Sequence, residues 1–415
     1  MKKRLSLFLR IGLALAGLAY IGFNLDWTDR LAFPAGYAWS PGQTFEEPVA
    51  LEIVADQPAG YRVRFDGDVA GVEVPPGATI DGFVVPRESL GTGEGDVRYR
   101  PAVQTMLREA DVWLLLAGLS MWLGVIPLQV YRWWSLLRCQ GLHTSFYKAF
   151  KLTMVGMFFN ICMPGATGGD VMKAYYAAKG AEKGEGLRTA AVISVFVDRL
   201  IGLIGLVVLA GVAGLLLLGD PDTHAITAVV WGIIGVLVLG SMVYFTRLRR
   251  WLLLDRLIAA LPGKGVVQKV DSATHAYGKH RPTAVLALGL SVAAHTLITT
   301  SIALAGMALG VEHSVGFMIA TLPLVLLAQA VPLFPLGLGV ADAAALKLLV
   351  KPAAATANQV LGLMLIQRLY LIFYAAVGSL VLVRGDIGLH GRQDAERDEA
   401  DELGSAEARA SVEQR

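Results

Sequence analysis

Long apolar runs separated by short polar segments dominate the pattern of this chain of 415 residues. A helix rises about 1.5 Å per residue, so about 20 apolar residues cross the roughly 30 Å hydrocarbon core of a bilayer. The pattern therefore predicts six membrane-spanning helices in an all-α polytopic membrane protein. The six runs are 5–23, 111–131, 189–218, 224–245, 283–309 and 357–383.

Two further apolar runs, 146–180 and 315–350, are interrupted by proline and glycine. The interruptions extend from Asn160 to Asp170 and from Gln329 to Asp342. Irregular backbone at membrane depth is tolerated only where it is buried in protein or lines a watered cavity. Both runs are therefore predicted to form re-entrant or broken helical hairpins. One such interruption in each half of a chain is typical of a transport site near the bilayer midplane.

The distribution of basic residues predicts the topology, because Lys and Arg accumulate in short cytoplasmic loops. Lys and Arg flank both ends of the first broken run, so it enters from the cytoplasm and returns there. The second broken run begins and ends outside. The sequence thus predicts an inverted repeat of about 111–218 and 283–383, with both termini cytoplasmic in the cell (inner) membrane.

Three other segments complete the predicted domain organisation. Residues 1–23 follow a basic N-terminus and are expected to form an uncleaved signal anchor. Residues 24–110 contain short alternating runs bounded by Gly and Pro, which predict a small external β subdomain. The membrane domain then occupies 111–385. Residues 386–415 are acidic and rich in small residues, and we expect a disordered cytoplasmic tail.

The composition supports membrane insertion, since 55% of the residues are hydrophobic and only 17% are charged. An ordinary soluble domain carries about a quarter charged residues. The net charge of +2 does not indicate a nucleic-acid partner. The sequence contains no zinc-protease pattern, nucleotide-binding loop or nucleophile elbow, so no cofactor, metal or catalytic residue is predicted. The two cysteines, Cys139 and Cys162, are predicted to be buried free thiols.

Charged residues inside apolar runs are the candidates for function, because such a charge is costly and needs a partner. Asp170 and Asp342 end the two interruptions, and an arginine follows each acid 29 or 26 residues later, at Arg199 and Arg368. We expect each hairpin acid to pair with an intramembrane arginine. Such pairs would either contact a transported ligand or only hold the hairpins in place, and the two roles are compatible.

The residues around these acids resemble the signatures of a flippase-like membrane family related to the transmembrane domain of lysylphosphatidylglycerol synthases. The resemblance covers about 111–385. The first signature is matched by Asn160, Pro164, Gly165, Gly168, Gly169, Asp170 and Lys173, followed by Asp198 and Arg199. The second is matched by Pro335, Gly337, Gly339, Val340 and Asp342, with Arg368 beyond. Pro332 joins the predicted substrate path because it also breaks the second run.

The resemblance implies that membrane lipids are the ligands and that lipid is moved without being lysylated, because an acidic tail follows the last span. Lys173, Asp342 and Asp198 depart from the family pattern of Arg, Glu and Glu, and each change keeps the charge. In this interpretation a polar cavity between the hairpins takes the head group of a phospholipid or lipid-linked molecule.

Three alternatives remain open from the sequence. One is a membrane-embedded transferase acting on a lipid-linked substrate, with Asp220 and Asp222 as external acids. Another is a transporter of a small solute, which an inverted repeat permits equally well. The last is a structural partner of an envelope enzyme, with the β subdomain as the contact surface.

Overall fold

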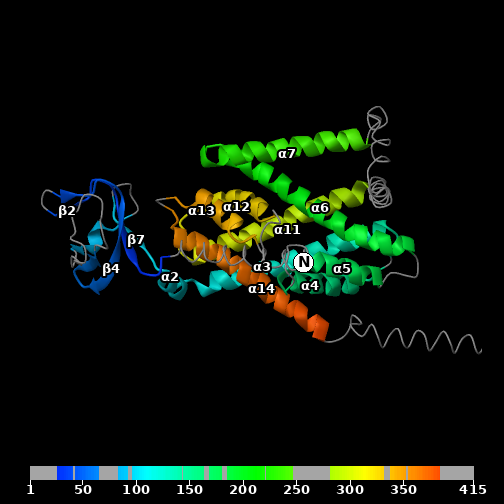
Figure 1. Ribbon diagram of the computed structural model, residues 1–415, viewed down its shortest axis with the longest axis horizontal. Helices are drawn as coiled ribbons and strands as arrows, with labels where there is room; N and C mark the ends of the chain where they lie inside the picture. The colour runs from blue at the N-terminus through cyan, green and yellow to red at the C-terminus, as the bar shows by residue number, and fades with distance from the viewer. Residues whose placement is uncertain are drawn as a thin grey trace, which may run out of the picture.

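A computed structural model shows a helical body with a small β-sheet at one end (Figure 1). The predicted first span, 5–23, and the predicted tail lie outside the described residues. The structure describes residues 26–40, 43–64, 83–91, 96–142, 144–162, 168–179, 185–219, 221–245, 281–330, 337–351 and 354–383.

Five of the described helices are long and apolar enough to cross a membrane, by length and composition. They correspond to five of the six predicted spans, so the prediction of an all-α polytopic protein is confirmed. α3 is longer than its apolar run and continues past Arg132. These helices are α3 (Val112–Cys139), α6 (Glu185–Leu216), α7 (Pro221–Phe245), α11 (Arg281–Ala308) and α14 (Ala357–Val383).

The two broken runs form two pairs of shorter helices, as predicted. The first pair is α4 (Phe146–Cys162) and α5 (Gly168–Lys179), and the second is α12 (Val315–Ala330) and α13 (Val340–Leu349). The longest of the four, α4, has 17 residues and is about 26 Å long, which is short of a roughly 30 Å hydrocarbon core. Within each pair the two helices pack against each other, as a re-entrant hairpin requires.

The two halves of the membrane domain repeat the same packing in opposite directions. α4 packs against α14, and in the equivalent contact α12 packs against α6. The first helices of the halves, α3 and α11, are antiparallel: the Asp111 amide donates to the Ala308 carbonyl, and Ser301 Oγ donates to the Gly118 carbonyl. Antiparallel first helices are the relation that an inverted repeat demands. The predicted repeat is therefore seen in the helix packing.

The β subdomain holds a five-stranded antiparallel sheet in the order β6-β5-β4-β1-β7. Aromatic and aliphatic side chains, including Phe33, Phe45 and Trp39, cover one face of this sheet. The short helices η1 (Arg87–Ser89) and α2 (Val103–Glu109) lie before and after β7. The strands are β1 (Arg30–Phe33), β4 (Val49–Gln57), β5 (Gly60–Arg64), β6 (Val84–Val85) and β7 (Arg98–Arg100), and a separate pair is β2 (Ala38–Ser40) with β3 (Gln43–Thr44).

One buried asparagine at the start of α14 ties the β subdomain to the helices. The Asn358 side chain accepts from the Asp26 amide at 2.8 Å and donates to the carbonyls of Asp26 and Pro101 at 3.0 and 2.8 Å. Asp29 adds a second tie, because its carboxylate accepts from the Ala102 amide at the start of α2. Hydrogen bonds from one side chain to two chain segments fix the sheet at the end of a spanning helix.

Candidate functional site

The first hairpin acid lies beside an intramembrane arginine, as the sequence predicts. The Nε and Nη2 atoms of Arg199 on α6 are both 2.7 Å from Oδ1 of Asp170 on α5. The Arg199 side chain is 55% exposed, whereas that of Asp170 is 17% exposed. Arg199 lies within the candidate span Arg188–Leu216, so a half-exposed guanidinium occurs well inside an apolar helix. The expected pairing is confirmed, and one of its partners remains accessible.

Glycine and asparagine hold the two arms of this hairpin together. Asn160 Oδ1 accepts from the Gly169 amide at 2.9 Å. A methyl group at position 169 would overlap the Gly156 carbonyl oxygen, so the arms approach to backbone contact. Asn160 therefore caps the first turn of α5.

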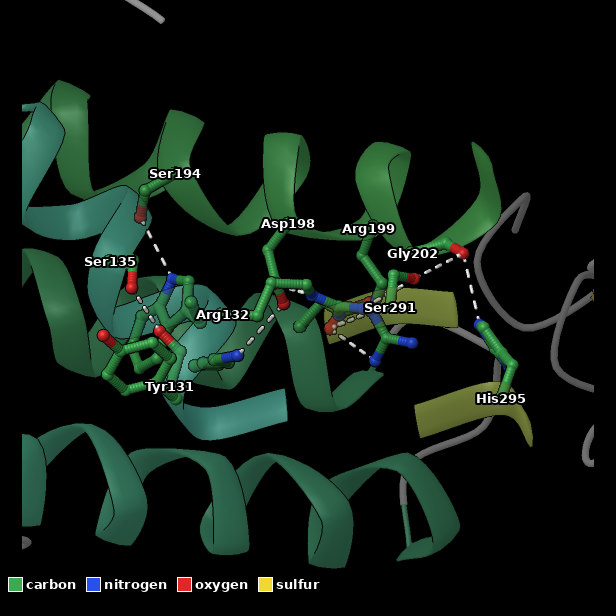
Figure 2. Close-up of polar contacts among 12 residues, drawn as sticks. Tyr131, Arg132, Ser135, Ser194, Asp198, Arg199, Gly202, Ser291 and His295 are labelled. Carbon is green, nitrogen blue, oxygen red and sulfur yellow. Dashed lines mark hydrogen bonds and ion pairs between the residues drawn. The ribbon is translucent and has the colours of Figure 1, made fainter. Parts of the chain in front are cut away.

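A buried cluster of three charges lies next to this pair and was not predicted from the sequence (Figure 2). Asp198 Oδ1 accepts from Arg132 Nε at 2.8 Å, and its Oδ2 is 3.5 Å from Lys173 Nζ. The Lys173 ammonium also lies over the Trp133 ring, 3.9 Å from its centroid. All three charged side chains are at least nine-tenths buried. Lys173 on α5 thus joins the hairpin to both α3 and α6.

Polar groups of α11, a third spanning helix, extend this cluster (Figure 2). Arg132 Nη1 donates to Ser291 Oγ at 3.1 Å, and Ser291 donates to the Gly202 carbonyl at 3.2 Å. His295 Nε2 bonds to the same carbonyl, also at 3.2 Å. This contact joins α11 to α6. Side chains from three spanning helices therefore meet around Arg132.

The second hairpin acid is also paired, but its pair is sealed within protein. Arg368 Nη2 on α14 is 2.8 Å from Asp342 Oδ2 on α13, and the two side chains are 5% and 0% exposed. The same carboxylate oxygen accepts from the Gly339 amide at 2.8 Å, which caps the start of α13. Gly337 and Gly339 have φ angles of 67° and 84°, a region that favours glycine. The second interruption therefore contains irregular backbone, as predicted.

Several buried polar atoms around the second pair carry no hydrogen bond from the described part of the chain. They are Asp342 Oδ1, Arg368 Nε and Gln367 Oε1. Gln367 Nε2 donates to Gln329 Oε1 at 3.2 Å, so the polar group reaches the end of α12. Such atoms are costly to bury without a partner.

The formal charges of the two clusters differ. Around the first hairpin, three cations (Arg132, Lys173, Arg199) face two acids (Asp170, Asp198), so the sum is 3 − 2 = +1. The formal charges of Arg368 and Asp342 sum to zero.

Among the described residues no group of three His, Cys, Asp or Glu side chains is placed to hold a metal ion.

The structure places eleven of the fifteen predicted site residues. The other four, Pro164, Gly165, Pro332 and Pro335, lie outside the described residues, as do the connections between the two helices of each hairpin. The prediction that both cysteines are buried was wrong, because Cys162 is exposed and Cys139 is half-buried. Arg132 was missed because it follows directly after the apolar stretch that was taken to end the span. Its pairing with Asp198 depends on packing between α3 and α6.

Comparisons with known proteins agree with this architecture. A family model described as the lysylphosphatidylglycerol synthase TM region matches residues 101–378, which include both hairpins and exclude the sheet. A relative from Pyrococcus horikoshii, the UPF0104 membrane protein PH1989, is 29% identical over 107 residues. That match covers 26% of this chain and 31% of the relative's own length. No solved structure matches. The chain is a multi-pass membrane protein that belongs to the family of the lysylphosphatidylglycerol synthase transmembrane region.

Proposed function

We propose that this protein moves a phospholipid, or another lipid with a phosphate-bearing head group, across the membrane. The observation that carries the proposal is the half-exposed Arg199, which lies between a carboxylate and an apolar surface. A guanidinium binds phosphate with strong charge-assisted hydrogen bonds, and it is costly to expose to hydrocarbon without such a partner. In this proposal the head group of the lipid binds at Arg199 and Asp170.

The side chains beside Arg199 favour a lipid over a small solute. Phe196, Leu200 and Leu203 are 61%, 44% and 45% exposed and lie along one stripe of α6. On α5 the exposed Val171 lies next to Asp170 in the chain. An amphipathic ligand would place its phosphate at Arg199 and its acyl chains along this apolar stripe. A small polar solute would gain nothing from the stripe.

The excess positive charge beneath Arg199 supports an anionic ligand. Lys173 and Arg132 share the single carboxylate of Asp198, so the cluster holds one cation more than it has acids. An anion near Arg199 is attracted by this excess, and attraction between charges is stronger in surroundings of low dielectric constant than in water. Lys173 in this proposal stabilises the bound head group from inside the protein, while Asp170 releases Arg199 when phosphate arrives.

Lipid scrambling in proteoliposomes tests the proposal. Fluorescent phospholipids are followed for wild type, Asp170→Asn and Arg199→Gln, and we expect wild type to move lipid and both variants to lose at least about tenfold, the value of one charge-assisted hydrogen bond. Arg138→Gln is the matched control, because Arg138 is an exposed arginine of α3 that stacks on Trp134. It should retain the wild-type rate.

Three outcomes would contradict parts of the proposal. If wild type moves no phospholipid of any head group, lipid translocation is wrong. If wild type moves lipid and both site variants keep full activity, the assignment of Arg199 and Asp170 is wrong. Uptake of a soluble phosphate compound without lipid movement would instead favour the solute transporter.

A further inference from the structure

We infer that the face of the β-sheet opposite its apolar core face binds anionic phospholipid head groups at the membrane surface. This surface lies outside the 101–378 region that the family model matches, and it does not depend on translocation. Neighbouring residues of a strand point to opposite faces of a sheet, so the alternation of side chains along the strands assigns each residue to one face.

One face of the sheet is the apolar core face already described. Leu31, Leu51 and Val63 are buried in that core, and Ile53 and Tyr99 pack against it. The residues between them therefore point to the other face. On that face β1 contributes Arg30, β4 contributes Glu52, β5 contributes Arg62 and Arg64, and β7 contributes Arg98 and Arg100. We call these six residues the arginine face.

The strand register places four of these residues in one row. Arg100 is opposite Arg30, Arg30 is opposite Glu52, and Glu52 is opposite Arg64. Five arginines and one glutamate give the arginine face a formal charge of 5 − 1 = +4. Like charges directly opposite each other destabilise a sheet, and Arg30 faces Arg100 across such a pair. A cost of this kind is explained by a function that needs concentrated positive charge.

The row begins where the sheet joins the spanning helices (Figure 1). Arg100 precedes Pro101, whose carbonyl accepts from Asn358 at the start of α14. Arg30 pairs with Asp26 at 3.4 Å, and Asp26 is bonded to the same asparagine. The end of a spanning helix lies near the lipid head groups. The arginine face thus extends outward from the level at which phosphates occur.

Two exposed tryptophans mark the same level. Trp27, beside Asp26, is 59% exposed, and Trp113, in the first turn of α3, is 80% exposed. Tryptophan is enriched at the interface between membrane and water. Arginines near an anionic leaflet are attracted to it, and the attraction falls off within a Debye length of about 10 Å. Position and charge therefore favour membrane phosphates over a soluble polyanion as the ligand.

Native mass spectrometry of the full chain in detergent tests this inference. The protein is titrated with phosphatidylglycerol or phosphatidylcholine, and we expect preferential binding of the anionic lipid. Arg62→Gln combined with Arg64→Gln and Arg100→Gln should weaken phosphatidylglycerol binding about tenfold or more, since each basic residue near an anionic surface contributes roughly fivefold. Arg87→Gln is the matched control, because Arg87 belongs to the same subdomain but pairs with Asp56.

A gain-of-binding variant separates loss of charge from loss of folding. Glu52→Gln removes the single acid of the arginine face and should tighten phosphatidylglycerol binding several-fold, which an unfolded sheet cannot do. Arg199→Gln should leave this binding in place, because the transport site is separate. The inference is overturned if the triple variant binds like wild type, if Glu52→Gln weakens binding, or if soluble polyphosphate binds and phosphatidylglycerol does not.

Discussion

The first and second hairpins share one plan but hold their acids in different surroundings. Each acid lies in the first turn of the returning helix and pairs with an arginine of the last helix of its half. Arg199 of the first pair is half exposed and has two buried cations as neighbours. Arg368 and Asp342 of the second pair are sealed and electrically balanced.

This difference leads us to propose different roles for the two pairs. A sealed ion pair in low-dielectric surroundings contributes to holding helices together only while both partners are present. An exposed arginine is stabilised less by its acid and remains available to a ligand. In our proposal the first pair therefore binds the ligand, while Arg368 and Asp342 position the second hairpin. The same substitution made at the arginine of each pair tests whether the two pairs have these different roles.

The largest effect on stability is expected from Arg368→Gln. The substitution leaves the Asp342 carboxylate buried without a countercharge, and breaking such a pair costs about 3–5 kcal/mol. Thermal unfolding in detergent should show a much lower midpoint than wild type. The double variant Arg368→Gln with Asp342→Asn restores charge balance and should recover part of the loss. Equal midpoints for wild type and the single variant would mean that the second pair is not a structural contact.

A smaller effect is expected from Gly169→Ala, which tests the hairpin geometry of the first half. The added methyl group would meet the Gly156 carbonyl and the Asn160 side chain, and such overpacking costs about 1–3 kcal/mol. The matched control is Gly235→Ala in α7, where a methyl group meets no atom within 4 Å. Unfolding curves of the two variants give the comparison, and a stable Gly169→Ala protein would contradict the close approach of the two arms.

The sequence alone could predict the hairpins and the pairing of each hairpin acid with an intramembrane arginine, but not which arginine each acid takes. Proline and glycine mark the breaks, and a charge inside an apolar run needs a partner, so Asp170 and Asp342 had few candidates for pairing. The difference in solvent exposure between the two arginines could not be predicted, because exposure depends on which helices surround each side chain. Arg132 shows the same limit, since its partners Asp198 and Ser291 are far from it in the chain.

The smallest effect on stability is expected from Arg199→Gln, although it makes the same chemical change as Arg368→Gln. Because the Arg199 side chain is half exposed, its pair with Asp170 should contribute no more than about 1 kcal/mol to folding. Unfolding of the two variants side by side in one detergent measures the difference, while lipid scrambling should fall only because the head group has lost its cation. If Arg199→Gln is as destabilising as Arg368→Gln, both arginines are structural and the ligand site lies elsewhere. If Arg199→Gln is instead stable but inactive, the first pair binds the ligand and the second pair stabilises the fold.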